Sequence, residues 1–434
     1  MPPPSHQRPK LAVGPPKSAG YWIQPWYFSY ALLGVAVAGL IPILLPLFVN
    51  QSGNPSDVGV VMAAFSLGGL TAPLWGELAD RHRLHRVLLA GGLLLTGITL
   101  AALVFTGSLP GRIGLAFLQG TGFGAAGTVA NLFIVENHPR AEWDERIGWL
   151  QTFYGTGQVV GLLLSAVLTG PRLARGILLA AGFNLLAFVI AWWKAPAPSP
   201  QPSLRPVLRH VPRHAECPGG SPQRLYNVTL GALRDFARAA TSTFAVFLLA
   251  WTLSYAGTTV VFSQYPVLMR AAYGIGPTTS SLGFGVAAAI GLLLYAPAGG
   301  FSDHIAPLPV VQIGLGLRLL ALAAMLAILV AHRLEWFSLL AFVAIVVAWS
   351  LLSVSGTGLV ARISPVGEGS GMGIFNAATA VAGVIGAAVG GWAATRWGYR
   401  AALELATASS SLGLLLTFFR SRGTRTAQSM RMLT

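Results

Sequence analysis

The chain has 434 residues, of which 54% are hydrophobic and only 9% are charged. Ordinary soluble domains carry about 25% charged residues, so this composition excludes a water-soluble protein and indicates a surface that faces hydrocarbon. The 28 Lys and Arg residues outnumber the 13 Asp and Glu residues, but they lie in short segments between long apolar runs. That placement favours a bilayer over nucleic acid as the partner. A single cysteine, Cys217, excludes a disulfide framework and a multi-cysteine metal site.

The first 25 residues are rich in proline and carry Arg8, Lys10 and Lys17. No short apolar core with a small-residue cleavage site follows, so we expect residues 1–25 to form a cytoplasmic tail rather than a removed signal peptide. A membrane span needs about 20 mostly apolar residues. Twelve stretches meet this requirement, at roughly 26–49, 57–79, 86–106, 113–135, 148–169, 175–193, 243–265, 279–301, 309–331, 336–358, 371–394 and 399–419.

A polar, proline-rich gap at about 194–242 holds seven Lys or Arg residues and no run that could cross a membrane. The pattern predicts an all-α membrane protein with 12 transmembrane helices in two pseudo-symmetric six-helix bundles. The predicted organisation is an N-terminal bundle at 26–193, a cytoplasmic linker loop at 194–242, a C-terminal bundle at 243–419 and a cytoplasmic tail at 420–434.

The basic residues also predict the orientation. If both termini lie on one side, the tails and even-numbered loops hold 20 of the 28 Lys and Arg residues, the opposite loops hold 7, and Arg318 lies inside a span. The positive-inside rule then places both termini in the cytoplasm. We therefore expect an integral protein of the plasma membrane, which in a bacterium is the inner membrane.

The two halves repeat a pattern about 220 residues apart. Spans one and two end with Leu45-Pro46-Leu47-Phe48 and Gly76-Glu77-Leu78-Ala79-Asp80. Spans seven and eight end with Tyr265-Pro266-Val267-Leu268 and Gly299-Gly300-Phe301-Ser302-Asp303. Many transporter folds use such an internal duplication to place a substrate site between two halves.

The loop after span two resembles the signature of the major facilitator superfamily, Gly-x-Leu-Ala-Asp-Arg-x-Gly-Arg-Arg. Arg83 replaces the second glycine, and Leu84 and His85 replace two basic residues. A degenerate copy in the second half keeps Gly299 and Asp303. The resemblance covers about residues 26–420 and implies the twelve-helix fold of that family. The matching residues are Gly76, Leu78, Ala79, Asp80, Arg81 and Arg86.

The resemblance also implies a latch between the halves. An unpaired carboxylate at a membrane boundary is unfavourable, and the free N–H groups of a helix N-terminus attract an anion. Asp80 is expected to contact such a terminus at Gly369-Ser370-Gly371. With Arg81 and Arg86 it would hold the halves together in the outward-open state; the alternative is a basic loop that only sets orientation.

A second family pattern, Arg-x-x-Gln-Gly-x-Gly, is partly present in span four. Gln119, Gly120 and Gly122 match, but Ala116 occupies the position of the arginine that the family links to proton coupling. In span five, Gly157-x-x-x-Gly161 is expected to let two helices approach closely.

Ionisable residues inside a membrane are candidates for function. Arg318, near the middle of span nine, is expected either to bind an anionic substrate group or to form a structural ion pair with Glu404 of span twelve. Glu136, at the end of span four, is expected either to take part in gating or proton binding or to pair with Arg140 or Arg146.

Neutral polar and aromatic side chains on spans that can face the interior are candidates for a substrate cavity. As a group they indicate a site for a neutral or amphipathic organic molecule, although each alone also fits hydrogen bonding between helices. They are Tyr30, Gln119, Asn131, Gln158, Trp251, Tyr255, Gln264, Trp349, Ser353 and Asn376.

These patterns predict secondary active transport of a small organic solute by alternating access, with efflux favoured and protons as a candidate coupling ion. The rival hypotheses are a nutrient uptake permease and a non-transporting receptor or assembly protein on the same fold. The sequence has no phosphate-binding loop, metal-spaced His or Cys cluster or paired catalytic groups, so we expect no enzyme activity, metal or cofactor. The expected partners are the substrate, protons and the lipid bilayer, without nucleic acid, and the protein is expected to be a monomer.

Overall fold

The computed structural model describes residues 19–51, 54–139, 142–196, 243–305, 307–332, 334–365 and 368–431. Every regular element in these ranges is a helix. The N-terminal part contains α1 (Ala19–Trp22), α2 (Tyr27–Leu33), the π-helix η1 (Gly34–Leu40), α3 (Ile41–Asn50), α4 (Pro55–Gly69), α5 (Ala72–His82), α6 (His85–Phe105), α7 (Leu109–Asn137), α8 (Trp143–Val167), the short 3-10 helix η3 (Gly170–Arg172) and α9 (Leu173–Lys194). The C-terminal part contains α11 (Thr243–Phe262), α12 (Tyr265–Tyr273), α13 (Pro277–Ile305), α14 (Pro307–Ala331), α15 (Phe337–Ile363) and α16 (Glu368–Arg431).

The described helices are consistent with the twelve predicted crossings. Ten described segments are long and apolar enough to span a membrane. One of them, Gly371–Phe418, is 48 residues long and contains Gly398 with φ 85° and ψ 170°, where the helix breaks, so it supplies two crossings. The twelfth crossing is α8, which has 25 residues and begins with the polar sequence Trp-Asp-Glu-Arg.

Two predicted spans are interrupted in ways that the apolar pattern did not indicate. The span expected at 57–79 consists of α4 and α5, which are separated at Leu70 and Thr71. Pro73, at the second position of α5, cannot donate the backbone hydrogen bond that would continue α4. The span expected at 243–265 ends as α11 at Phe262, and α12 begins after Gln264 with Pro266 near its start.

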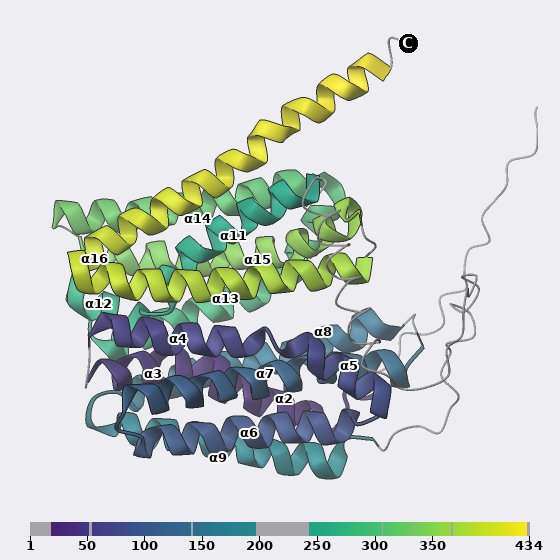
Figure 1. Ribbon diagram of the computed structural model, residues 1–434, viewed down its shortest axis with the longest axis vertical. Helices are drawn as coiled ribbons and strands as arrows, with labels where there is room; N and C mark the ends of the chain where they lie inside the picture. The colour runs from purple at the N-terminus through teal and green to yellow at the C-terminus, as the bar shows by residue number, and fades with distance from the viewer. Residues whose placement is uncertain are drawn as a thin grey trace, which may run out of the picture.

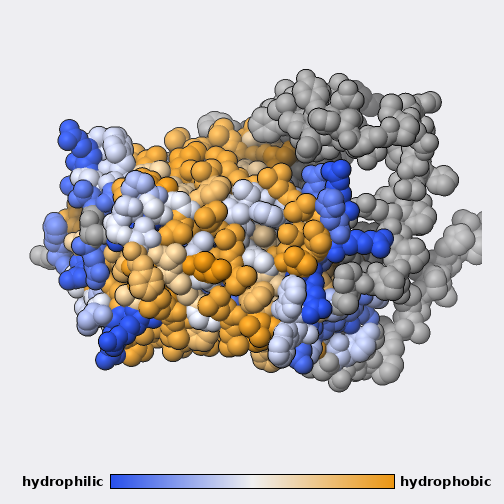
Figure 2. Space-filling model, turned by 60° about the horizontal axis from the view of Figure 1, so that its bottom comes forward, coloured by the Kyte–Doolittle hydropathy of each residue, from blue (hydrophilic) through white to orange (hydrophobic). Residues whose placement is uncertain are grey.

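Figure 1 shows the helices in two groups, with α2 to α9 in one and α11 to α16 in the other. Figure 2 shows an apolar band around the middle of the molecule and hydrophilic residues gathered at its two ends. The band is the surface that a bilayer would cover, because lipid tails favour apolar side chains. Residues 197–242 of the linker predicted at 194–242 lie outside the described residues, and the domain bounds remain predictions.

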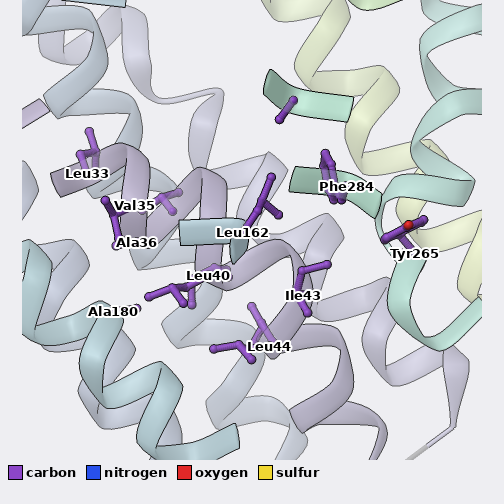
Figure 3. Packing of buried hydrophobic residues seen from close by; sticks show 14 of the residues in the cluster. Leu33, Val35, Ala36, Leu40, Ile43, Leu44, Leu162, Ala180, Tyr265 and Phe284 are labelled. Atoms are coloured by element: carbon purple, nitrogen blue, oxygen red, sulfur yellow. The ribbon is translucent and has the colours of Figure 1, made fainter. Parts of the chain in front are cut away.

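The buried core continues from one group of helices to the other. Leu40 and Leu44 of the first crossing and Leu162 of α8 belong to the same apolar cluster as Tyr265 and Phe284 of the C-terminal part (Figure 3). The ring of Tyr265 stacks on Phe342 at 3.8 Å between centroids. The two groups therefore share one packed core where they meet.

The predicted close packing at Gly157 and Gly161 is confirmed. A Cβ atom on Gly157 would lie 2.0 Å from the carbonyl oxygen of Ala31, and one on Gly161 would lie 2.1 Å from that of Val35. Only glycine lets α8 approach the first crossing this closely. The π-helical stretch η1 lies at the same contact, at Gly34–Leu40.

Candidate functional site

The seam between α4 and the first half of α16 joins the two groups of helices. The backbone N–H of Ser56 donates a hydrogen bond of 2.8 Å to Thr395 Oγ1. A Cβ on Gly59 would lie 2.8 Å from the Cα of Gly391, and a Cβ on Gly383 would lie 3.1 Å from Ser66 Oγ. The two helices are antiparallel, because residue numbers increase along α4 as those of the contacting residues in α16 decrease.

The same seam opens toward one end of the molecule. We call the end at which α9 ends and α11 begins the linker end, and the opposite end the far end. The contacts at Ser56 and Gly59 lie at the far end. Continuing the register past Ser66 would place Pro73 opposite Asn376, and both of these residues are exposed. The two groups thus touch along the far half of the seam and separate toward the linker end.

A second seam, between α8 and α13, extends further. At the far end, Thr169 Oγ1 lies 3.1 Å from Thr278 Oγ1. A Cβ on Gly285 would lie 3.3 Å from Leu163, and one on Gly155 would lie 2.7 Å from Leu292. The α8–α13 seam is therefore in close contact from the far end to the middle of α8.

Aromatic rings from three helices meet on the inner side of the C-terminal group. The ring centroid of Trp251 lies 4.7 Å from that of Phe375 and 6.1 Å from that of Trp349. Trp349 also lies 5.7 Å from Tyr255. The indole N–H of Trp251 donates a hydrogen bond of 2.8 Å to Thr379 Oγ1, which fixes the orientation of the ring. We call Trp251, Tyr255, Trp349 and Phe375 the aromatic cluster.

Arg318 of α14 lies against this cluster. Its guanidinium carbon is 5.8 Å from the ring centroid of Trp349, and the side chain is only 2% exposed. Its Nε atom is buried without a hydrogen-bond partner. The predicted ion pair with Glu404 is wrong, because Glu404 Oε1 instead accepts a hydrogen bond of 2.8 Å from Arg400, four residues earlier on an exposed helix face.

The other predicted cavity residues are spread over both groups. Tyr30 is buried beside Tyr154, with 5.2 Å between ring centroids. The amide of Asn131 donates a hydrogen bond of 2.9 Å to the carbonyl of Gly127, on its own helix. Gln119 is fully buried, and neither its nitrogen nor its oxygen has a hydrogen-bond partner.

Four further candidates lie in different surroundings. Gln158 and Ser353 are half-buried on α8 and α15. Gln264 lies at the far-end seam, where its oxygen accepts a hydrogen bond of 3.2 Å from the hydroxyl of Tyr399. Asn376 is exposed directly after the buried Phe375. Of all the predicted cavity residues, the structure brings Trp251, Tyr255 and Trp349 together.

The signature loop lies at the linker end. Gly76 is buried against α7, and a Cβ there would lie 3.3 Å from Thr128. Arg81 is exposed, whereas Arg86 donates a hydrogen bond to the carbonyl of Trp192 and lies 5.4 Å from the centroid of its ring. The side chains of Asp80, Glu136, Gly299 and Asp303 lie outside the described part of the chain.

A polar cluster at the linker end was not predicted as a unit. Glu142 Oε2 accepts hydrogen bonds of 3.0 Å and 2.9 Å from Nε and Nη2 of Arg146. Tyr21 donates a hydrogen bond of 2.9 Å to Glu142 Oε1, and the guanidinium of Arg146 lies 5.1 Å from the Tyr21 ring centroid. The pKa of nearby His138 is lowered by burial and by the positive charge of Arg146. We call this group the Glu142 cluster.

The sequence contained signals for some of these contacts. Phe247, Trp251 and Tyr255 recur every four residues, which places them on one helix face. The spacing of Glu142 and Arg146 is also that of neighbours on a helix. The contribution of Tyr21 carried no signal, because it comes from a segment 121 residues away from Glu142.

Two curated bacterial proteins are similar to part of the chain. The multidrug efflux pump Tap of Mycolicibacterium fortuitum is 21% identical over 169 residues, a match that covers 38% of this chain and 41% of Tap. The multi-drug resistance efflux pump PmrA of Streptococcus pneumoniae is 28% identical over 173 residues, covering 38% of this chain and 42% of PmrA. The matches thus span less than half the length of these relatives.

Solved structures share the fold over nearly the whole chain. The nucleoside transporter NupG has a TM-score of 0.72 at 14% identity, with 92% of this chain and 98% of NupG covered. A bacterial homologue of the lysosomal transporter Spinster, in an inward-facing and occupied conformation, has a TM-score of 0.68 at 14% identity, with 92% and 96% covered. A D-xylose–proton symporter has a TM-score of 0.66 at 16% identity, with 92% and 98% covered.

The sequence also matches a known family over most of its length. The family described as the Major Facilitator Superfamily matches residues 26–255 and 246–432. The match includes the signature loop at Gly76 and Asp80 and all of the helices that form the two seams. The chain therefore belongs to the Major Facilitator Superfamily.

Proposed function

We propose that the chain is a secondary active transporter that exports a small organic solute by alternating access. The observation that carries the proposal is the α4–α16 seam, which is closed at Gly59 and Gly391 and open at Pro73 and Asn376. Two bodies that touch at one end and separate at the other can expose a central site to one side at a time.

The proposed orientation places the linker end in the cytoplasm, because the tails and the linker hold most of the basic residues. In that orientation the described conformation faces inward. The membrane would be the plasma membrane, or the inner membrane of a bacterium. Both termini and the 194–242 segment between the bundles would be cytoplasmic, and the working unit would be one chain.

Export is favoured by the curated relatives Tap and PmrA, whose names describe efflux pumps. The relevant solutes would be organic molecules with aromatic or apolar surface, because the partly exposed rings of Tyr255 and Trp349 lie side by side in the C-terminal group. Aromatic rings bind such molecules through stacking and apolar burial.

The proposed latch involves the signature loop. In the inward-facing conformation Arg86 is bound to the end of α9 in its own half. When the linker end closes, the seam register would bring Asp80 toward the beginning of α16, at Gly369-Ser370-Gly371. The free N–H groups of that helix start would then bind the carboxylate of Asp80 and hold the outward-open state.

Tracer flux in proteoliposomes tests the function. The wild-type protein would be reconstituted and supplied with neutral, cationic and anionic aromatic solutes, with and without an imposed pH gradient. Asp80→Asn is the test variant, and Asp57→Asn, at the other end of the same crossing, is the matched control. We expect gradient-dependent flux in wild type and Asp57→Asn, and a loss of at least about tenfold in Asp80→Asn.

Each outcome has a consequence. Accumulation driven in the direction of uptake would contradict export and favour a nutrient permease. Flux that ignores the pH gradient would contradict proton coupling and favour another ion or the solute's own gradient. An absence of flux for every solute, from protein that elutes as a folded monomer, would contradict the proposed transport and favour a receptor or assembly role.

A further inference from the structure

Arg318 is a buried positive charge that its own helices do not neutralise. Burying a charge without a partner is costly, so buried arginines are normally paired. Among the described residues no carboxylate forms an ion pair with Arg318, and its guanidinium carbon lies 5.8 Å from the ring centroid of Trp349. Arginine does not escape this cost by losing its proton, because the guanidinium group stays protonated in proteins.

The sequence supplies no partner at the depth of Arg318 within the C-terminal helices. Beyond the linker it contains four acidic residues, Asp303, Glu335, Glu368 and Glu404. Asp303 falls near the end of α13, Glu335 in the turn before α15, and Glu368 at the first residue of α16. Glu404 is bound to Arg400. Arg318, by contrast, lies near the middle of α14.

The aromatic ring below the guanidinium offsets only part of the cost. A cation over an aromatic face gains about 0.5–2 kcal/mol, but the N–H groups at the edge of the guanidinium point in its plane and need acceptors. The buried Nε of Arg318 has none. The planar N–H donors of a guanidinium group bind carboxylates and other planar anions when the protein offers them no acceptor.

The groups beside Arg318 fit an aromatic ligand. Trp349 and Tyr255 are half-buried, so their rings are not fully covered by protein. Trp251 is held by Thr379, and its ring packs beside Phe375. The next residue, Asn376, is exposed on the face where the two groups of helices separate. Tyr255, Trp349 and Arg318 lie at similar depths, near the middle of α11, α15 and α14.

From these observations we infer that Arg318 and the aromatic cluster form a binding site for an aromatic organic anion. The anionic group binds the guanidinium edge, and the ring of the ligand packs against Trp349 and Tyr255. The inference rests on the proposed transport function and narrows its substrate class, because an arginine without an internal partner selects for ligands that bring their own negative charge.

Direct binding tests the site separately from transport. The full chain in detergent would be titrated by calorimetry with a panel of aromatic carboxylates, such as benzoate, 2-naphthoate and indole-3-acetate, each paired with its neutral amide. We expect at least one carboxylate to bind about tenfold or more tightly than its amide, the difference typical of a hydrogen bond to a charged group. Arg318→Gln should remove that preference and leave amide binding within about twofold.

Two further variants keep the test interpretable. Arg318→Lys retains the charge but loses the planar fork, so it should keep only part of the preference. Arg400→Gln removes an arginine of an exposed face and should leave the preference unchanged. If Arg318→Gln does not elute as folded protein, the site is tested by the ratio of carboxylate affinity to amide affinity, measured in the wild type and in Arg318→Lys.

The site is refuted if no carboxylate is preferred over its amide, or if the preference survives in Arg318→Gln. Transport of neutral or cationic solutes without any anion preference would leave the transporter proposal intact and overturn the anion site. Arg318-dependent binding of a carboxylate without flux would support the site and overturn the transport proposal. The two proposals therefore fail in different measurements.

Discussion

Gly59 of α4 and Gly391 of α16 lie in direct contact across the two halves of the protein. A Cβ on Gly59 would lie 2.8 Å from the Cα of Gly391 and 2.5 Å from the carbonyl oxygen of Ala387. In the proposed alternating-access cycle, this contact would form only when the far end is closed. Its stability would then set the share of the protein that faces inward.

Gly59→Ala should shift the protein toward the outward-facing state. The added methyl group overpacks the closed seam, which typically costs about 1–3 kcal/mol and so changes the population ratio by about fivefold or more. The measurement is the rate at which a membrane-impermeant maleimide modifies Asn376→Cys in inside-out vesicles, in a Cys217→Ser background. The rate should fall in Gly59→Ala.

Gly69→Ala is the matched control for this substitution. It lies on the same helix, but a Cβ there has no neighbour within 4 Å. Equal labelling rates in wild type, Gly59→Ala and Gly69→Ala would show that the seam does not set the conformational balance.

Arg83→Gly should stabilise the protein. Arg83 ends α5 with φ 55° and ψ 35°, a left-handed conformation that costs a residue with a side chain about 1–2 kcal/mol and that glycine adopts freely. After the greater flexibility of glycine in the unfolded chain is subtracted, the net gain should be about 0.5–1 kcal/mol. The thermal unfolding midpoint in detergent measures the gain.

Arg81→Gly is the same substitution at a second position, and we expect it to lower the thermal unfolding midpoint. Arg81 lies inside α5, where glycine costs about 1 kcal/mol relative to good helix formers. Its midpoint should fall while that of Arg83→Gly rises. A fall in both variants would mean that the arginine side chain at position 83 contributes more than its backbone strain costs.

The helices could be predicted from the sequence because each crossing needs a long apolar run, and such runs are visible without a structure. The family signature also located the loop at Gly76. The break at Thr71 was not visible, because a single proline at position 73 ends one helix and begins another inside a continuous apolar stretch. The left-handed conformation of Arg83 had an indirect signal, since the family has glycine at that position.

The site was predicted only in part. Trp251, Tyr255 and Trp349 were expected to face the interior, and they lie together. The predicted ion pair between Arg318 and Glu404 was wrong. The position of a residue along a helix indicates its depth in the membrane, but it does not show which neighbouring helix a long side chain contacts. Gln264 was expected in the cavity but lies at the far-end seam, since the helix break after Phe262 turns the chain there.

Glu142→Gln should destabilise the protein far more than Glu404→Gln. Both glutamates pair with an arginine four residues away, but the exposed fractions are 4% and 11% for Arg146 and Glu142 and 65% and 49% for Arg400 and Glu404. Breaking a buried pair leaves an uncompensated charge and costs about 3–5 kcal/mol, whereas exposed pairs contribute about 0–1 kcal/mol. Thermal unfolding midpoints of the two variants measure the difference, and similar midpoints would contradict the structural role of the Glu142 cluster.

The same cluster contains a histidine that is held neutral. Gln24 Oε1 accepts a hydrogen bond of 2.6 Å from the indole N–H of Trp26, so its amide nitrogen faces His138 Nε2 at 3.0 Å. That nitrogen of His138 must therefore accept a hydrogen bond and carries no proton. Arg146 faces the ring with a positive charge and Glu142 with a negative one, and burial and Arg146 together lower the pKa of His138.

Acidification below about pH 6.5, the ordinary pKa of histidine, should therefore weaken the attachment of the N-terminal segment. A pKa that is lower in the folded than in the unfolded protein gives a stability contribution that is present above about pH 6.5 and is lost as the pH falls. The unfolding midpoint of the wild-type protein in detergent should drop between pH 7.5 and 5.5 by more than that of His138→Gln, whose amide stays neutral. His82→Gln, a change of an exposed histidine at the end of α5, should keep the pH dependence of the wild type. If His138→Gln shows the full wild-type pH dependence, protonation of His138 is not what destabilises the cluster.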